Sequence, residues 1–364
     1  MQYQLSKEIT QFSAREATVL LPVFNGIPYI TEAIDSILGQ TFTNFELLVI
    51  DDGSTDDTLT ILQSFAAKDP RVRVISRENR GLIATLNQGI SLSNTELIVR
   101  MDADDIALPT RLERQIVFMK SHPDIAVCGT GITLYETGEN RYLPEKNDAL
   151  RVLALFNTPV FHPTVIMRKS SVLKLGGYSY DSPCAEDYDL WERMLHSGSK
   201  FANLCEVLLM YRIHPNINRS QYYTKMAATS LNICCRQLKR LGLPTTPSSL
   251  ALHRICCAPC PETPRMHARV IDWLHRIEKA NLNKKLYPQE ILNYELALRK
   301  QKFFLINPFR QPIAWTARTL RHFTHYLLSL ISHDFSSLEG RLASCWWHIK
   351  KLLQHQKFFL MLIC

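Results

Sequence analysis

The chain has 364 residues, 46% of them hydrophobic and 21% charged, which is typical of a globular protein with one large domain and an appendage, or with two domains. No run approaches the roughly 20 continuous apolar residues of a membrane-spanning helix, so we expect a chain that does not cross a bilayer. The net charge of +8 comes entirely from residues 299–364, and a charge so confined does not predict a nucleic-acid-binding protein.

The first 130 residues alternate short apolar runs with segments of helical periodicity. Strands are predicted at 18–24, 46–50, 71–75 and 96–101, and helices at 28–38, after 54–57, at 82–92 and at 109–121. This alternation predicts βαβ units and an α/β fold with a parallel sheet. The next stretch is mixed, with strands near 126–128, 164–168 and 204–213 and helices near 170–175 and 187–196. After 215 the chain is predicted to be helical, with breaks at 242–247 and 258–264.

Acidic motifs follow two of the predicted strands. Asp51-Asp52-Gly53-Ser54 ends the second strand, and Asp102-Ala103-Asp104 ends the fourth. Right-handed crossovers bring the carboxyl ends of parallel strands to one edge of the sheet, where ligands of α/β proteins bind. Carboxylates gathered there are suited to Mg²⁺ or Mn²⁺ with a substrate diphosphate. An acidic helix start is the alternative explanation of Asp102-Ala103-Asp104, whereas a helix cap explains Ser54 but not the two adjacent acids before it.

A third acidic group, Glu186-Asp187-Tyr188-Asp189, opens a predicted helix just after Gly176-Gly177-Tyr178. Its acids are compatible with the helix dipole, and one of them could also act as a general base toward a hydroxyl group. The first strand lacks the G-x-G-x-x-G fingerprint, which disfavours a dehydrogenase.

Together these motifs resemble glycosyltransferase family 2, whose members have the GT-A fold. The resemblance covers about residues 17–215 and follows the family's order. Its motifs are 21–26 (LPVFNG), 50–56 (IDDGSTD), 79–81 (NRG) with 87–89 (NQG), 100–105 (RMDADD), 162–164 (HPT), 176–178 (GGY), 186–191 (EDYDLW) and 211–214 (YRIH). It implies a Rossmann-like GT-A domain at 17–215 after an N-terminal extension at 1–16, and beyond it the sequence pattern itself predicts a mostly helical, basic region at 216–364.

The resemblance also implies an activity. Members of the family transfer a sugar with inversion, assisted by Mg²⁺ or Mn²⁺, from a nucleotide-diphosphate sugar such as a UDP-sugar. The expected acceptor is a hydroxyl of a glycan or lipid-linked molecule, in the biosynthesis of a bacterial surface polysaccharide such as lipopolysaccharide. The Gln-x-x-Arg-Trp motif of processive synthases is absent from this sequence, which favours addition of a single sugar. The alternatives are a polyprenyl-phosphate sugar synthase and an inactive glycan- or lipid-binding scaffold.

Site residues carry over from the family position by position. Asp187 matches the catalytic base. The expected nucleotide-binding residues are Pro22, Phe24, Asn25, Asp52, Arg80 and Asp102. Asp104 and His214 are expected at the metal, and Glu186, Trp191 and His162 in the acceptor region.

Cysteines are numerous, with ten in the chain. The polar start of the sequence lacks the apolar core of a signal peptide, so we expect a cytoplasmic protein with reduced thiols. Cys257 and Cys260 have the spacing of a zinc-ligand pair, and Cys256, Cys234 and Cys235 lie nearby in sequence. A second correctly spaced pair is missing, so the spacing favours unliganded thiols over zinc.

The basic tail, residues 299–364, mixes its cations with aromatic residues, including three of the five tryptophans. Such segments resemble interfacial helices on anionic lipid, which would hold the protein at the cytoplasmic face of the inner membrane. The alternative is a basic helical subdomain that packs on the catalytic domain or on another subunit. No nucleic-acid-binding motif accompanies the tail, so no nucleic acid is expected as a partner.

Overall fold

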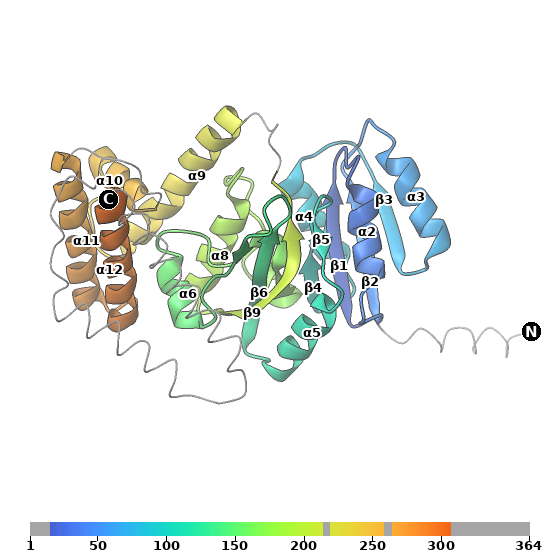
Figure 1. Cartoon of the computed structure of the whole chain (residues 1–364), viewed down its shortest axis with the longest axis horizontal. Coiled ribbons are helices and arrows are strands. Elements are labelled where there is room, and N and C mark those ends of the chain that lie inside the picture. Colours follow the sequence, from blue (N-terminus) through green and yellow to red (C-terminus); the bar gives the residue numbers. More distant parts are fainter. Residues whose placement is uncertain (1–14, 214–218, 258–263, 307–364) are drawn as a thin grey trace, which may run out of the picture. The chain divides into compact units, whose positions relative to one another are not determined.

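The structure is a computed structural model that describes residues 15–213, 219–257 and 264–306 (Figure 1). The chain forms two compact units. The first comprises the chain up to Leu150 together with Thr158–Ile233, and the second comprises Arg151–Asn157 together with the chain from Cys234 onward. The short segment Arg151–Asn157 therefore leaves the first unit and contributes to the second.

The first unit is built on one nine-stranded sheet in the described residues. Its strand order is β3-β2-β1-β4-β8-β6-β9-β5, and β7 pairs with β6. The bounds are β1 Ala17–Val23, β2 Phe45–Asp51, β3 Val72–Ser76, β4 Leu97–Arg100, β5 Ile106–Ala107, β6 Ile125–Leu134, β7 Asn140–Arg141, β8 Ile166–Arg168 and β9 Lys200–Tyr211.

Helices cover both faces of this sheet. Their bounds are α2 Ile30–Leu38, α3 Thr58–Lys68, α4 Leu82–Leu92, α5 Arg111–Ser121, α6 Asn147–Leu153, α7 Lys169–Leu173 and α8 Glu186–His196, and a 3-10 turn spans His162–Thr164. Alternate residues of β1, such as Val19 and Leu21, pack in one apolar cluster with buried residues of α2, α3 and α5. Leu20, on the opposite face, packs so closely on α4 that a Cβ atom on Gly89 would lie 2.1 Å from it. The central strands are therefore buried on both sides, as their continuous apolar runs predict.

The prediction of a parallel sheet from the first 130 residues is right for its four strands, and β6 also runs parallel to β9, but the sheet as a whole is mixed. β3, β2, β1 and β4 are mutually parallel. β8 instead runs antiparallel to both of its neighbours, β4 and β6, and β5 runs antiparallel to β9. Apolar periodicity reports which residues of a strand are buried and carries no information about strand direction, so the sequence pattern could not show this reversal.

The second unit is helical. It contains the end of α9 (Arg219–Arg240), with α10 (Pro247–Cys257), α11 (Pro264–Lys284) and α12 (Gln289–Ile306). Its core combines side chains of these helices, including Trp273, Leu274 and Leu292, with Leu155 and Phe156 of the short segment. Of the helices that the structure describes, not one combines the length and apolar character that crossing a bilayer requires.

Candidate active site

The acidic motifs meet at the carboxyl edge of the parallel half-sheet. Val23 of β1 pairs with Asp51 of β2, and the Asp52 N–H donates to the Val23 carbonyl at 2.8 Å. On the other side of β1, the Met101 N–H donates to the Leu20 carbonyl at 3.1 Å, so the turn after β4 starts at the same edge. The strand order reverses between β1 and β4, which is the point where open α/β sheets form their ligand crevice.

Three carboxylates crowd the turn after β4. Asp102, Asp104 and Asp105 each offer an oxygen, and these oxygens lie within 4.8 Å of one another. Burial and, after it, the charges of Asp102 and Asp104 raise the pKa of Asp105 to about 8. One Asp105 oxygen, Oδ1, accepts the backbone N–H of Arg212 at 3.0 Å, while Oδ2 is buried with no hydrogen-bond partner in the described residues. The cluster thus concentrates three acids in one turn, where burial and mutual repulsion oppose their full ionisation.

Two buried arginines lie behind the cluster. Arg100, the last residue of β4, is 3% exposed and forms an ion pair with Asp102. Arg111 is fully buried at the start of α5 and donates to the Arg100 carbonyl at 2.7 Å, and burial lowers its pKa to about 9. Sequence reasoning gave neither residue a role. The available signal was a charged residue at the end of an apolar strand, since such a residue is buried at a cost unless it is paired.

Asp187, in the first turn of α8, which starts at Glu186, interacts electrostatically with Asp102 and Arg100. Burial raises the pKa of Asp187, and burial likewise raises the pKa of Glu186 to about 7. Burial also raises the pKa of Asp102, with the charges of Asp104 and Asp187 adding to the effect of burial and Arg100 opposing it. The carboxylates after β4 and at the start of α8 therefore share one electrostatic environment.

Aromatic side chains pack beside the start of α8. The Asn87 carboxamide binds the backbone of Tyr178 with both of its polar atoms. Its oxygen accepts the Tyr178 N–H at 2.9 Å, and its nitrogen donates to the Tyr178 carbonyl at 2.8 Å. The Tyr178 hydroxyl is 2.8 Å from His162 Nε2, and both rings lie edge-on to Trp191. Trp191 is fully buried, so it packs behind the site, and of the other expected acceptor residues Glu186 is buried and His162 is half-buried. Gly177 has φ +75°, and a Cβ there would lie 2.4 Å from the Asn87 oxygen.

The turn after β2 is fixed by Asp52. Its two oxygens accept the N–H groups of Arg80 at 2.9 Å and Gly81 at 2.8 Å, and it forms an ion pair with Arg77. Gly53 has φ +77°, and a Cβ there would lie 2.7 Å from the Asn79 nitrogen, so this turn packs directly on the loop before α4. Asp52 therefore positions residues 77–81, whatever further contact it makes with a nucleotide. The Arg80 side chain is exposed and pairs with Glu78.

The loop after β1 lies beside this turn. The Asn25 N–H donates to Ser54 Oγ at 2.9 Å, and Asn25 Oδ1 accepts the Thr55 N–H at 2.8 Å. Pro22 is buried in the strand, while the Phe24 ring is 50% exposed and is free to stack on a planar ligand. The residues expected to bind the nucleoside are thus brought together at the ends of β1 and β2. His214 lies outside the described residues.

A hard divalent cation fits the carboxylate cluster. Its ligands would all be oxygen, as Mg²⁺ and Mn²⁺ prefer, and the unpartnered Asp105 oxygen and the mutual repulsion of three acids are what a cation would relieve. Arg100 pairs with Asp102, and a bound divalent ion would favour the ionised form of Asp105.

Comparison with known proteins agrees with this geometry. Residues 18–176 match the family described as Glycosyl transferase family 2. The chain is 37% identical over 208 residues to the O-antigen biosynthesis glycosyltransferase WbnJ of Escherichia coli, covering 54% of this chain and 79% of that protein.

Two solved structures resemble the fold. S. aureus TarS 1–349, solved with UDP-GlcNAc, aligns with a TM-score of 0.52 at 18% identity over 80% of this chain and 90% of that one. The mannosyltransferase PcManGT of Pyrobaculum calidifontis, solved with GDP-Man and Mn²⁺, aligns with a TM-score of 0.52 at 18% identity over 91% of this chain and 94% of that one. With its sheet, its helical C-terminal region and these relatives, the chain belongs to glycosyltransferase family 2 and has the GT-A fold.

Proposed function

We propose that the protein transfers a single sugar, with inversion, from a nucleotide-diphosphate sugar to a hydroxyl of a glycan or lipid-linked acceptor. The observation that carries the proposal is the arrangement of two acidic groups around one site: the cluster after β4 and Asp187 at the start of α8. The cluster after β4 is suited to bind a diphosphate with its cation, and Asp187 is suited to act as a general base. The O-antigen relative supports a surface polysaccharide as the product.

The donor binds at the carboxyl edge of the sheet in this proposal. Asp102, Asp104 and Asp105 would hold Mg²⁺ or Mn²⁺, which when bound supplies the positive charge that neutralises the leaving diphosphate. Manganese in the PcManGT structure supports this choice of ion. The exposed Phe24 ring and the paired loops after β1 and β2 provide the surface for the nucleoside.

Asp187 acts as the general base. Its carboxylate takes the proton of the acceptor hydroxyl as that oxygen attacks the anomeric carbon from the face opposite the diphosphate. Burial raises the pKa of Asp187 above that of an ordinary aspartate, which makes it a stronger base. The clamped Tyr178 and the buried Trp191 fix the position of this helix start, so that the base and the carboxylate cluster keep their separation.

A binding experiment tests the donor site first. We expect thermal-shift screening of nucleotide sugars with Mn²⁺ to identify one donor class, and calorimetry to show that its binding needs the metal. Asp104→Ala should abolish the metal-dependent part of binding, whereas Asp124→Ala, an exposed acid paired with Lys200, should leave it unchanged. Donor binding that is equally tight with a chelator and in Asp104→Ala would contradict the proposed site.

A further inference from the structure

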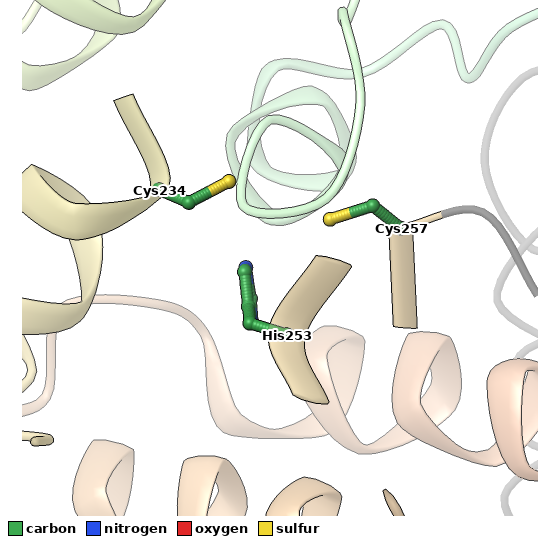
Figure 2. Close-up of side chains that lie close together, drawn as sticks. All are labelled: Cys234, His253 and Cys257. Carbon is green, nitrogen blue, oxygen red and sulfur yellow. The ribbon is translucent and has the colours of Figure 1, made fainter. Parts of the chain in front are cut away.

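A second group of metal-ligating side chains lies in the helical unit. Cys234 comes from α9, and His253 and Cys257 come from α10, one helical turn apart on the same face. Figure 2 shows the three side chains pointing toward a common centre. One ligand atom of each lies within 4.8 Å of the other two.

The surroundings of this group are apolar. Cys234 and His253 are buried, and the neighbouring core includes Cys256, Trp273 and Leu274. The thiols of Cys234 and Cys257 are free rather than joined in a disulfide. The group therefore gathers two sulfur donors and an imidazole away from water, which is the donor set of a zinc site.

Two hydrogen bonds fix the tautomer of His253. Its Nε2 lies 2.9 Å from the Leu155 carbonyl oxygen, which only accepts hydrogen bonds, so this nitrogen carries the proton. The Nδ1 lone pair accepts the Trp273 N–H in a long contact of 3.4 Å, which metal binding through Nδ1 would have to displace. Metal-binding histidines are typically fixed in this way by a carbonyl or carboxylate on the other ring nitrogen.

We propose that Cys234, His253 and Cys257 form a zinc site that joins α9 to α10 in the second unit. Sulfur and imidazole ligands select Zn²⁺ over the Mg²⁺ and Mn²⁺ of the carboxylate cluster. In a tetrahedral zinc site the ligand atoms lie roughly 3.5–3.8 Å apart, so binding would draw atoms that now lie within 4.8 Å together by about 1 Å at most. That change is within reach of side-chain rotation.

The sequence alone favours unliganded thiols, because Cys257 and Cys260 lack a second pair at zinc-binding spacing. The structure supplies the missing ligands from His253 and from a separate helix. Cys260 lies outside the described residues and takes no part in the argument. Structural zinc contributes directly to folding free energy, so we expect the ion to stabilise the second unit.

Metal analysis of the full chain tests the site. The protein is purified without chelator from zinc-supplemented medium, and zinc is measured by mass spectrometry after exchange into excess Mg²⁺. We expect about one zinc per chain in the wild type and in Cys235→Ser, whose half-buried thiol lies next to Cys234 but outside the group. Zinc should fall to background in Cys234→Ser and in Cys257→Ser. Equal zinc in all four proteins would overturn the assignment.

A second measurement on the wild type guards against variants that do not fold. The chain is stripped of metal under reducing conditions and titrated with Co²⁺, which reports its ligands spectroscopically. We expect thiolate-to-cobalt charge transfer and the strong visible bands of a tetrahedral ion, both removed by one equivalent of Zn²⁺. A refolded wild type that binds neither ion, cobalt bound without charge transfer, or an oxidised Cys234–Cys257 pair without metal would each refute the proposal.

Discussion

Replacing Arg77 by methionine should expose how strongly the site depends on one ion pair. Arg77 is buried to about the same extent as its partner Asp52, with 11% and 6% of the side chains exposed. Its guanidinium also donates to Gln88 Oε1 at 2.6 Å, to the Glu78 carbonyl at 2.7 Å and to Thr85 Oγ1 at 2.9 Å. Methionine keeps the aliphatic part of the side chain and removes all of these donors.

The expected cost follows from the burial of the pair. Removing one partner of a buried ion pair leaves the other charge uncompensated and destabilises a protein by about 3–5 kcal/mol. That loss corresponds to roughly two to four powers of ten in the ratio of folded to unfolded molecules. Arg73→Met is the matched control, because the Arg73–Glu46 pair is partly exposed and should contribute only about 0–1 kcal/mol.

Hydrogen exchange of peptides from β2 measures the effect within the first unit, without assuming that the whole chain unfolds in one step. The double variant Asp52→Asn/Arg77→Met removes both charges, so it should be less destabilised than the sum of the single variants. If the losses of stability of the two single variants simply add, or if Arg77→Met is no more destabilised than Arg73→Met, then the ion pair does not hold this turn.

Three further predictions concern catalysis, the acceptor side and the tail. Asp187→Asn should lower turnover by about 10²–10⁴-fold while donor binding persists, and Asp181→Asn, an exposed neighbour, should not. Because the base acts when deprotonated and burial raises its pKa, wild-type kcat should fall as pH drops through a value above that of ordinary aspartate, and a flat kcat profile would count against Asp187. Gly177→Ala should destabilise the protein by about 1–3 kcal/mol and lower its activity. Gly176→Ala should cost less, because Gly176 has similar backbone strain (φ +79°) but open space for a Cβ. Equal unfolding temperatures of the two variants would contradict this. Deleting residues 307–364 should abolish flotation with anionic vesicles, and equal recovery with the lipid would remove the tail as an anchor.

Much of the first unit could be predicted from sequence, because its signals are local. The run at Thr18–Phe24 (TVLLPVF) is apolar on both faces, and the structure confirms a central strand with helices packed on each side. Asp102 and Asp104 directly follow such a strand, so their place at the sheet edge follows from the topology. In these cases the residue and its neighbours in the chain determine the structure.

The missed features depend on residues distant in the chain. Nothing near Asp52 in sequence shows that its oxygens are taken by a loop 28 and 29 residues later. The sequence also gives no sign that β8 runs antiparallel to its neighbours, since a buried strand has the same composition in either direction. The link between Cys234 and Cys257 depends on how two helices pack, and spacing rules describe only ligands close in sequence.

The segment Arg151–Asn157 makes the helical unit discontinuous in the chain. Val152, Leu155 and Phe156 complete its core, and the Leu155 carbonyl also orients His253. A fragment that begins at residue 216 would lack these three side chains, so we expect it to fold poorly. During synthesis this segment leaves the ribosome about 80 residues before the last residue of α9 does. Its apolar side chains therefore stay exposed until the helices that bury them have been made.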